Sequence, residues 1–216
     1  MSRLFLFLCY NNLMLHNVYK TIGLTIIALF LVFVITAGII LLAGFPKYNP
    51  DKTLEIEGEV ADFFNKVTLP IKLARLSWLP ADQEILMPVY GIRAREITDS
   101  WMAPRPEERY HEGQDIFANL GTPVFSGTNG YITRLGEGNL GGLFVYIAGA
   151  GSRRYYYAHF NKIAEGLSVG QKVTTDTVIG FVGNTGNAEN TPYHLHFGVY
   201  ILRKAINPLP LIINRP

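Results

Sequence analysis

The chain has 216 residues and a formal net charge of +2, with a sequence pI near 8.6. This mild charge argues against a nucleic-acid partner, because domains that bind nucleic acids usually cluster basic side chains and have a pI above about 9. The single cysteine, Cys9, excludes an internal disulfide and a cysteine-based structural zinc site. The length allows one good-sized domain and one smaller element.

The first predicted element is an apolar run over residues 22–45 that contains no charged side chain. At about 1.5 Å per residue it would extend roughly 36 Å, enough to cross a bilayer core of about 30 Å. A cleaved signal peptide would have a shorter apolar region followed by a small-x-small cleavage site, which is absent after this run. We therefore expect an uncleaved transmembrane helix behind a short tail at residues 1–21. Two basic residues, Arg3 and Lys20, lie before the run, and Lys47 and Lys52 lie soon after it, so charge does not choose its orientation.

A membrane-proximal connector is expected over residues 46–87. Its mixture of acidic and apolar residues predicts one short amphipathic helix, and prolines at 70, 80 and 88 are expected to interrupt any longer one. Two interpretations stay open, a plain spacer and a helix that binds a partner.

Residues 88–208 are predicted to form a mainly β domain, followed by a C-terminal tail at 209–216. Short β-branched and aromatic runs alternate there with glycine-rich turns, which is typical of antiparallel sheets. The pair Asn129–Gly130 predicts a hairpin, because both turn positions of that hairpin type need a positive φ. The expected strands are 122–126 with 131–135 around that pair, 143–148 with 153–160 around GAGS, and then 178–183 and 193–200.

Two of the five histidines, His194 and His196, lie two residues apart in the predicted strand HLHFGVY. Side chains at this spacing point to one face of a strand, so Leu195 and Phe197 are expected to enter the core while both imidazoles meet one cavity. Solvated histidines on an open sheet face would show the same spacing.

The segment RYHEGQDIF places His111 and Asp115 four residues apart. Gly113 argues against a zinc-binding helix, because glycine costs about 1 kcal/mol in a helix interior, and Ile116 and Phe117 favour a strand. We expect a loop that leads into a strand, with both side chains able to face one ion. A turn histidine with an aspartate cap is the alternative.

His159 lies in YYYAHF near the expected end of a strand, where a lone histidine is usually a packed ring. The joint count changes this interpretation, since four of the five histidines fall in the β domain and only His16 lies elsewhere. Such a set suits a zinc ion held by two histidines and one carboxylate, with two further histidines for acid–base chemistry.

From about Pro88 to Pro208 the sequence resembles the lysostaphin or LytM-type zinc endopeptidases, which cut peptide bonds in bacterial cell-wall peptidoglycan. The resemblance rests on HxxxD, a histidine in a YAH segment, and HxH followed by an aromatic residue. Further family-like pieces recur in order: RYHEGQDIFANLGTPVFSGTNGYI, GGLFVYI, YYYAHF, VGQKVTTDTVIGFVGNTG and HLHFGVY.

This resemblance implies a mainly β, antiparallel LytM-like peptidase domain, of the duplicated hybrid motif kind. It implies that His111, Asp115 and His196 are Zn²⁺ ligands and that His159 and His194 are the catalytic pair. The implied activity is hydrolysis of peptidoglycan peptides by zinc-activated water. Together with the expected transmembrane helix, this makes the chain a membrane-anchored zinc metalloendopeptidase. We expect a single-span anchor in the cytoplasmic membrane, with the catalytic domain in the periplasm or outside.

Two segments depart from the family pattern. AENTPY at 188–193 replaces small residues before HxH, and Met102 stands in WMAPR where glycine is expected. Either change is expected to reshape the substrate groove, and neither removes a ligand. Because many relatives lack zinc ligands and activate other wall hydrolases, the alternative is a non-catalytic envelope protein of the same fold that binds peptidoglycan or activates another cell-wall hydrolase. A regulatory envelope partner is a further expectation.

Basic residues near these motifs have two interpretations. They form a solvated face, or they meet carboxylates of the wall peptide. They are Arg105, Arg109, Arg153 and Arg154.

Overall fold

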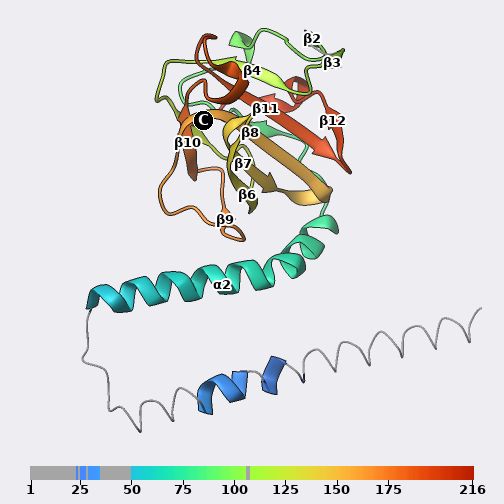
Figure 1. Ribbon diagram of the computed structural model, residues 1–216. Coiled ribbons are helices and arrows are strands. Elements are labelled where there is room, and N and C mark those ends of the chain that lie inside the picture. Colours follow the sequence, from blue (N-terminus) through green and yellow to red (C-terminus); the bar gives the residue numbers. More distant parts are fainter. Residues whose placement is uncertain (1–22, 24, 28, 35–49, 106–107) are drawn as a thin grey trace, which may run out of the picture. The chain divides into compact units, whose positions relative to one another are not determined.

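The computed structural model describes residues 23, 25–27, 29–34, 50–105 and 108–216 (Figure 1). The chain divides into two units, Met1–Leu54 and Glu55–Pro216. The expected tail at 1–21 and the greater part of the expected transmembrane helix at 22–45 lie outside the described residues. Within the described ranges, no helix is both long enough and apolar enough to span a bilayer.

The second unit is built on an antiparallel sheet, as the sequence predicts (Figure 1). Its strands follow the order β12-β11-β8-β7-β6-β9, with β4 beside β11, and β10 between β8 and β5. Two small pairs complete it, the parallel β1–β13 and the antiparallel β2–β3. The strands are β1 (Ile85–Leu86), β2 (Pro104–Arg105), β3 (Arg109–Tyr110), β4 (Gln114–Phe117), β5 (Pro123–Phe125), β6 (Gly130–Gly138), β7 (Gly142–Ala148), β8 (Arg153–Ile163), β9 (Lys172–Val173), β10 (Val178–Val182), β11 (His194–Ile201), β12 (Lys204–Ile206) and β13 (Ile212–Ile213).

Short 3₁₀ turns join several of these strands. They are η1 (Ala94–Glu96), η2 (Ala150–Ser152), η3 (Gly186–Ala188) and η4 (Leu209–Leu211). One of them closes the predicted hairpin between β7 and β8, which pair antiparallel around GAGS. Gly151 in this turn has a φ of 64°, a conformation that glycine adopts without strain.

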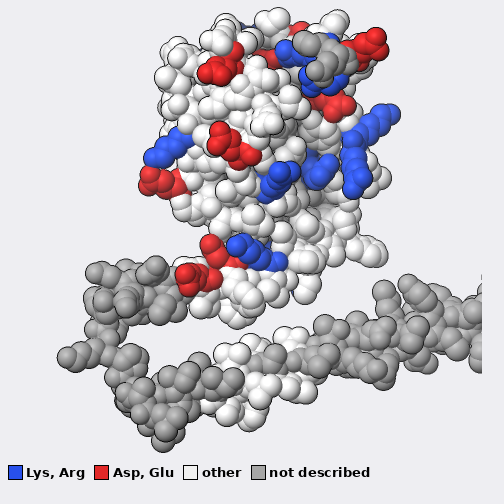
Figure 2. Space-filling model, in the orientation of Figure 1, with Lys and Arg blue, Asp and Glu red and all other residues white. Residues whose placement is uncertain are grey.

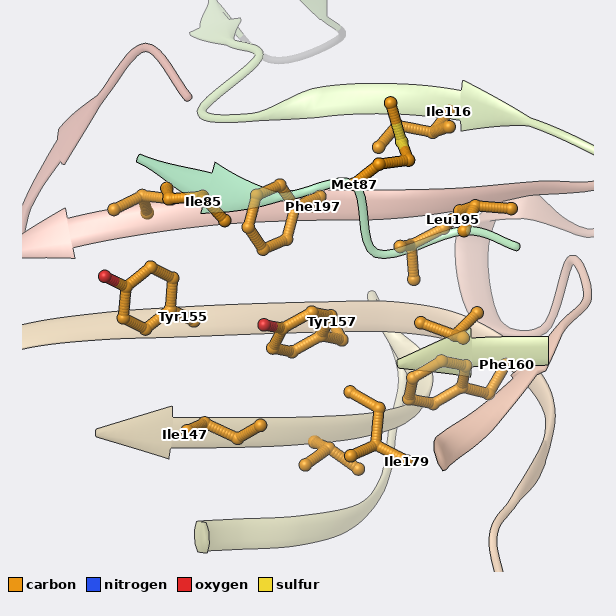
Figure 3. Close-up of a cluster of buried hydrophobic side chains, with 14 of the residues drawn as sticks. Ile85, Met87, Ile116, Ile147, Tyr155, Tyr157, Phe160, Ile179, Leu195 and Phe197 are labelled. Atoms are coloured by element: carbon orange, nitrogen blue, oxygen red, sulfur yellow. The ribbon is translucent and has the colours of Figure 1, made fainter. Parts of the chain in front are cut away.

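The core lies on one face of this sheet (Figure 3). Tyr155 and Tyr157 of β8 and Leu195 and Phe197 of β11 are completely buried in it, and the rings of Tyr157 and Phe197 lie 5.0 Å apart. Because neighbouring side chains on a strand point to opposite faces, the residues between them are directed to the other side of the sheet. Because Leu195 and Phe197 point into the core, His194 and His196 both point to the opposite face of the sheet, as predicted.

The predicted hairpin at Asn129–Gly130 is wrong. β5 pairs with β10, and β6 pairs with β7 and β9, so the strands on either side of this dipeptide do not pair with each other. The glycine has a different reason: a Cβ on Gly130 would lie 2.2 Å from the carbonyl oxygen of Ala148. Close approach of β6 to β7, and not turn geometry, requires glycine here.

The connector contains the predicted helix, but its predicted short length and its interruption at Pro70 are wrong, because α2 spans Pro50–Ser77 and continues through Pro70. A proline inside a helix costs about 3 kcal/mol, so other contacts must hold the helix together. The Asn65 backbone closely approaches Gly170, and the Lys72 ammonium donates to the Gly170 carbonyl at 3.0 Å. These contacts fix α2 to the β domain on both sides of Pro70.

Candidate metal centre

The sheet brings Asp115 and His196 together. Asp115 on β4 is the cross-strand partner of His196 on β11, so both side chains leave the sheet at the same point. His196 Nδ1 lies 3.2 Å from Asp115 Oδ1. Gly113, just before β4, leaves space for this imidazole, because a Cβ there would come within 2.7 Å of His196 Cε1.

His111 reaches the same point from the loop before β4, as the sequence predicts. Its Nδ1 lies 2.7 Å from the Ser100 carbonyl oxygen, and this oxygen can only accept, so Nδ1 carries the proton. In the neutral ring, Nε2 is therefore the unprotonated nitrogen, whose lone pair can bind a metal ion. It lies 2.9 Å from His196 Nδ1 and 3.1 Å from Asp115 Oδ1.

These three atoms suit a cation. One ligand atom from each of the three residues can be chosen so that all three lie within 4.8 Å of one another. When both imidazoles are neutral, only His196 Nδ1 can carry a proton among these three atoms. His111 Nε2, which is then unprotonated, faces Asp115 Oδ1 directly, so two acceptors face each other. A tetrahedral Zn²⁺ with bonds of about 2.0–2.1 Å needs ligand atoms roughly 3.3 Å apart, close to the separations of 2.9–3.2 Å. The donor set, two imidazoles and one carboxylate, fits zinc.

His159 and His194 flank this set without joining it. The His194 ring lies 5.0 Å from the His159 ring, and the His159 ring lies 5.9 Å from the His196 ring. Both rings have their Nδ1 at 2.8 Å from a backbone carbonyl, that of Thr185 for His159 and that of Pro192 for His194. In their neutral forms, each therefore keeps an unprotonated Nε2 that can accept a proton.

The backbone at His159 is strained. Its φ is 65°, which is uncommon outside glycine, and the pairing of β8 with β7 shifts register here. The shift is a β-bulge that lets the His159 amide donate to the Gly141 carbonyl at 2.8 Å. Strained residues gather at functional sites because surrounding contacts must hold them, and here the bulge turns the imidazole towards His194 and His196.

The electrostatics favour an ionised carboxylate among neutral rings. Burial raises the pKa of Asp115, but hydrogen bonds and electrostatic attraction from His111 and His196 outweigh it and hold that pKa well below its ordinary value. Burial lowers the pKa of His196 and lowers that of His159 to about 4. Metal ligands must be deprotonated, so these directions suit metal binding at neutral pH.

Two further residues support the site, and sequence reasoning did not assign them this role. Arg105 of β2 donates to Asp115 Oδ2 at 2.7 Å, which leaves Oδ1 to face the two imidazoles. Gln114, completely buried, accepts from the Ser100 amide at 2.9 Å through Oε1. Its amide group donates to Asp99 at 2.6 Å, so Gln114 holds the loop that orients His111. Arg153, by contrast, is buried and donates through Nη1 to the Asp82 carbonyl.

An open cavity of about 560 Å³ lies beside the site on the same side of the sheet. Tyr156 connects the two, because its ring lies 5.7 Å from the His196 ring and stacks on Tyr146 at 4.4 Å. The lining combines aromatic rings, one guanidinium and a glycine-containing loop. It consists of Arg134, Gly138, Asn139, Leu140, Gly141, Phe144, Tyr146 and Tyr156.

Comparison with known proteins finds that the sequence of this domain is similar to peptidases. The family described as Peptidase family M23 matches residues 109–208, which include all five candidate residues. An L-Ala--D-Glu endopeptidase of Bacillus subtilis is 40% identical over 97 residues, covering 43% of this chain and 30% of that protein. The DD-carboxypeptidase/endopeptidase Mpg of Neisseria meningitidis is 32% identical over 127 residues, covering 59% of this chain and 27% of that protein.

The fold has a counterpart among solved structures. A crystal structure of a putative peptidase M23 from Pseudomonas aeruginosa matches with a TM-score of 0.51 at 25% identity, covering 68% of this chain and 59% of that one. The chain spans less than a third of the length of the two curated relatives. The family model matches residues 109–208, within the β domain, and this part carries four of the five histidines.

Proposed function

The chain belongs to peptidase family M23, the lysostaphin and LytM-type family that its sequence resembles, and from its site we propose that it is a zinc endopeptidase acting on bacterial peptidoglycan. The observation that carries the proposal is the convergence of His111, Asp115 and His196 with their ligand atoms 2.9–3.2 Å apart. A purely structural β module has no reason to bury three acceptors against one another.

In this proposal His111 Nε2, His196 Nδ1 and Asp115 Oδ1 hold the ion. Zinc bound by such a set supplies Lewis acidity, which lowers the pKa of water to about 7 and polarises a carbonyl. The loop carbonyl of Ser100 fixes the His111 tautomer, and Arg105 holds Asp115 so that one oxygen faces the ion.

We assign the proton transfers to His159 and His194. Both rings have their Nδ1 held by a backbone carbonyl, so both direct Nε2 as the working atom. One accepts the proton of the attacking water, and the pair stabilises the oxyanion and returns a proton to the leaving amine. Neither ring needs to move, because the bulge at His159 and the Pro192 carbonyl already orient them.

The cavity beside Tyr156 is where we place the peptide substrate. Its aromatic walls suit the apolar stems of side chains, and Arg134 offers a guanidinium to a carboxylate. The endopeptidase activities named for the Bacillus and Neisseria relatives agree with a peptide as substrate.

Anchoring by residues 22–45 is part of the proposal, with the β domain outside the cytoplasm where peptidoglycan lies. Its support is the uncharged sequence of this run. Resistance of the full chain to carbonate extraction from membranes tests it, and release into the soluble fraction contradicts it.

The activity is tested with the purified full chain in detergent, loaded with zinc and incubated with purified peptidoglycan. We expect soluble fragments with new amino termini, detected by mass spectrometry. A chelator should stop their release and added zinc should restore it. The His159→Ala variant is the matched control for a contaminating hydrolase. Binding to peptidoglycan without fragments would favour the non-catalytic envelope protein instead.

A further inference from the structure

The helix α2 carries an apolar stripe that the β domain does not cover. Successive residues of a helix are about 100° apart, so the stripe residues within α2 fall inside an arc of about 100°. Their exposed fractions lie between 48% and 61%, and that of the tryptophan directly after the helix is 88%. The stripe consists of Val60, Phe63, Phe64, Val67 and Ile71, followed by Trp78.

The opposite side of α2 is fixed to the β domain. The Lys72 ammonium donates to the Gly170 carbonyl at 3.0 Å and lies 5.2 Å from the centre of the Tyr131 ring. In the part of α2 that the space-filling view draws in colour or white, the edge farthest from the β domain is uncharged (Figure 2). Rotation of the helix to bury the stripe against its own domain would break the contacts of Lys72.

An exposed apolar face of this size requires a partner, because monomeric soluble proteins rarely leave such continuous patches in water. The sequence before the helix indicates which partner. Only four residues separate the uncharged run at 22–45 from Pro50, so the five steps from residue 45 to residue 50 reach at most about 18 Å. The beginning of α2 therefore stays close to whatever surrounds that run.

The composition of α2 suits a lipid surface. Between residues 58 and 79 three basic residues oppose two acidic ones, a net charge of +1, and the acidic pair is Glu59 and Asp62. Arg75 lies beside the apolar stripe, and Trp78 stands at its end, as tryptophan commonly does where protein meets the headgroup region.

We propose that the stripe of α2 lies in the headgroup–acyl boundary of the membrane and so holds the peptidase domain against the bilayer surface. This rests on the anchoring part of the proposed function and is independent of zinc chemistry. The helix then connects the β domain to the membrane surface, because its apolar face binds lipid and its polar face binds the loop that contains Gly170.

The test uses the full chain in vesicles of phosphatidylethanolamine and phosphatidylglycerol. Cys9 is the only cysteine, so Cys9→Ser permits single labels, with an environment-sensitive fluorophore placed through Val67→Cys or, as the control, Lys66→Cys. Lys66 is also exposed but points about 100° away from Val67 on the helix. We expect nitroxide-labelled lipid to quench the label at 67 at least about twofold more than the label at 66. Replacement of Phe63 and Ile71 by serine should remove this difference while circular dichroism retains the helix.

The outcomes separate the two proposals. Equal, weak quenching at both positions overturns the lipid contact of α2, even if the chain resists carbonate extraction and is therefore anchored. A label at 67 that is shielded from water but not quenched by lipid also overturns it, because protein then covers the stripe. If carbonate extracts the chain, the anchor at 22–45 fails, and stronger quenching at 67 in the vesicles before extraction still supports the contact.

Discussion

Asp115 and His196 face each other from neighbouring strands, whereas His111 reaches them from a loop. The two strand residues are cross-strand partners in the ladder of β4 and β11, so backbone pairing alone fixes where they lie. His111 depends instead on the Ser100 carbonyl, and that loop depends on buried Gln114. A metal site on this sheet therefore has one half held by the ladder and another half held by side-chain hydrogen bonds.

The largest effect is expected where the ladder presents a ligand. Replacement of His196 by alanine removes one of the three proposed ligand atoms and leaves two acceptors unpaired, so zinc should be lost. Peptidoglycan hydrolysis should fall by roughly 10³-fold or more. Measurement of zinc by plasma mass spectrometry, together with fragment release, checks this. Full zinc content in the variant would remove His196 from the ligand set.

A large effect without metal loss is expected from the flanking histidines. His159→Ala should retain zinc and lower the turnover by about 10²–10⁴-fold, the usual contribution of acid–base catalysis. Metal content and turnover are measured on one preparation. Zinc loss comparable to that of a ligand variant would mean that His159 binds the ion.

The third-largest effect, a loss of zinc affinity, is expected when the space around His196, one of the two strand residues, is filled. In Gly113→Ala the new methyl group would lie within 2.7 Å of His196 Cε1 and of the Phe197 carbonyl oxygen, so the imidazole must shift. We expect zinc affinity to fall by about 10–100-fold in a competition titration with a chromophoric chelator. Gly138→Ala is the matched control, because its methyl group would meet only the Phe144 ring at 3.5 Å. An equal loss in both variants would point to a general loss of stability.

The loop half can be loosened separately. Gln114→Leu removes the acceptor of the Ser100 amide while keeping a buried side chain of similar size, and His111 should lose its fixed orientation. We expect zinc affinity to fall by about tenfold, at the lower end of the range for residues that orient ligands. Unchanged affinity would show that the ladder residues alone set the strength of binding.

The smallest effect is expected at Arg105. Its ion pair with Asp115 spans 2.7 Å, but the arginine side chain is 42% exposed, and such pairs contribute only about 0.2–1 kcal/mol. Arg105→Ala should therefore weaken zinc binding by no more than about fivefold, measured in the same titration. A loss as large as that of Gly113→Ala would place Arg105 among the residues essential for the site.

The same division explains what the sequence could predict. Strand periodicity predicted that His194 and His196 share a face opposite Leu195 and Phe197, because alternation along a strand is independent of the rest of the chain. Gly113 correctly indicated a loop before β4. Side-chain contacts between separate strands, such as Arg105 with Asp115, have no signal in the strand pattern, and neither do the carbonyls that orient three of the imidazoles.

Two predictions failed because tertiary contacts outweighed local preference. Asn129–Gly130 has the composition of a hairpin turn, but its glycine accommodates the Ala148 carbonyl. Proline usually ends a helix, but α2 continues through Pro70, and its contacts with the loop at Gly170 stabilise the helix there. Met102 stands where glycine was expected, and its φ of 57° shows why that position suits glycine.

The most direct test of the account compares the two histidines of HxH. Zinc content is measured side by side in purified His194→Ala and His196→Ala chains, after dialysis against the same buffered zinc. About one zinc ion per chain is expected in the first variant and almost none in the second. Equal zinc contents, or the reverse order, would contradict the assignment of one histidine to the metal and the other to proton transfer.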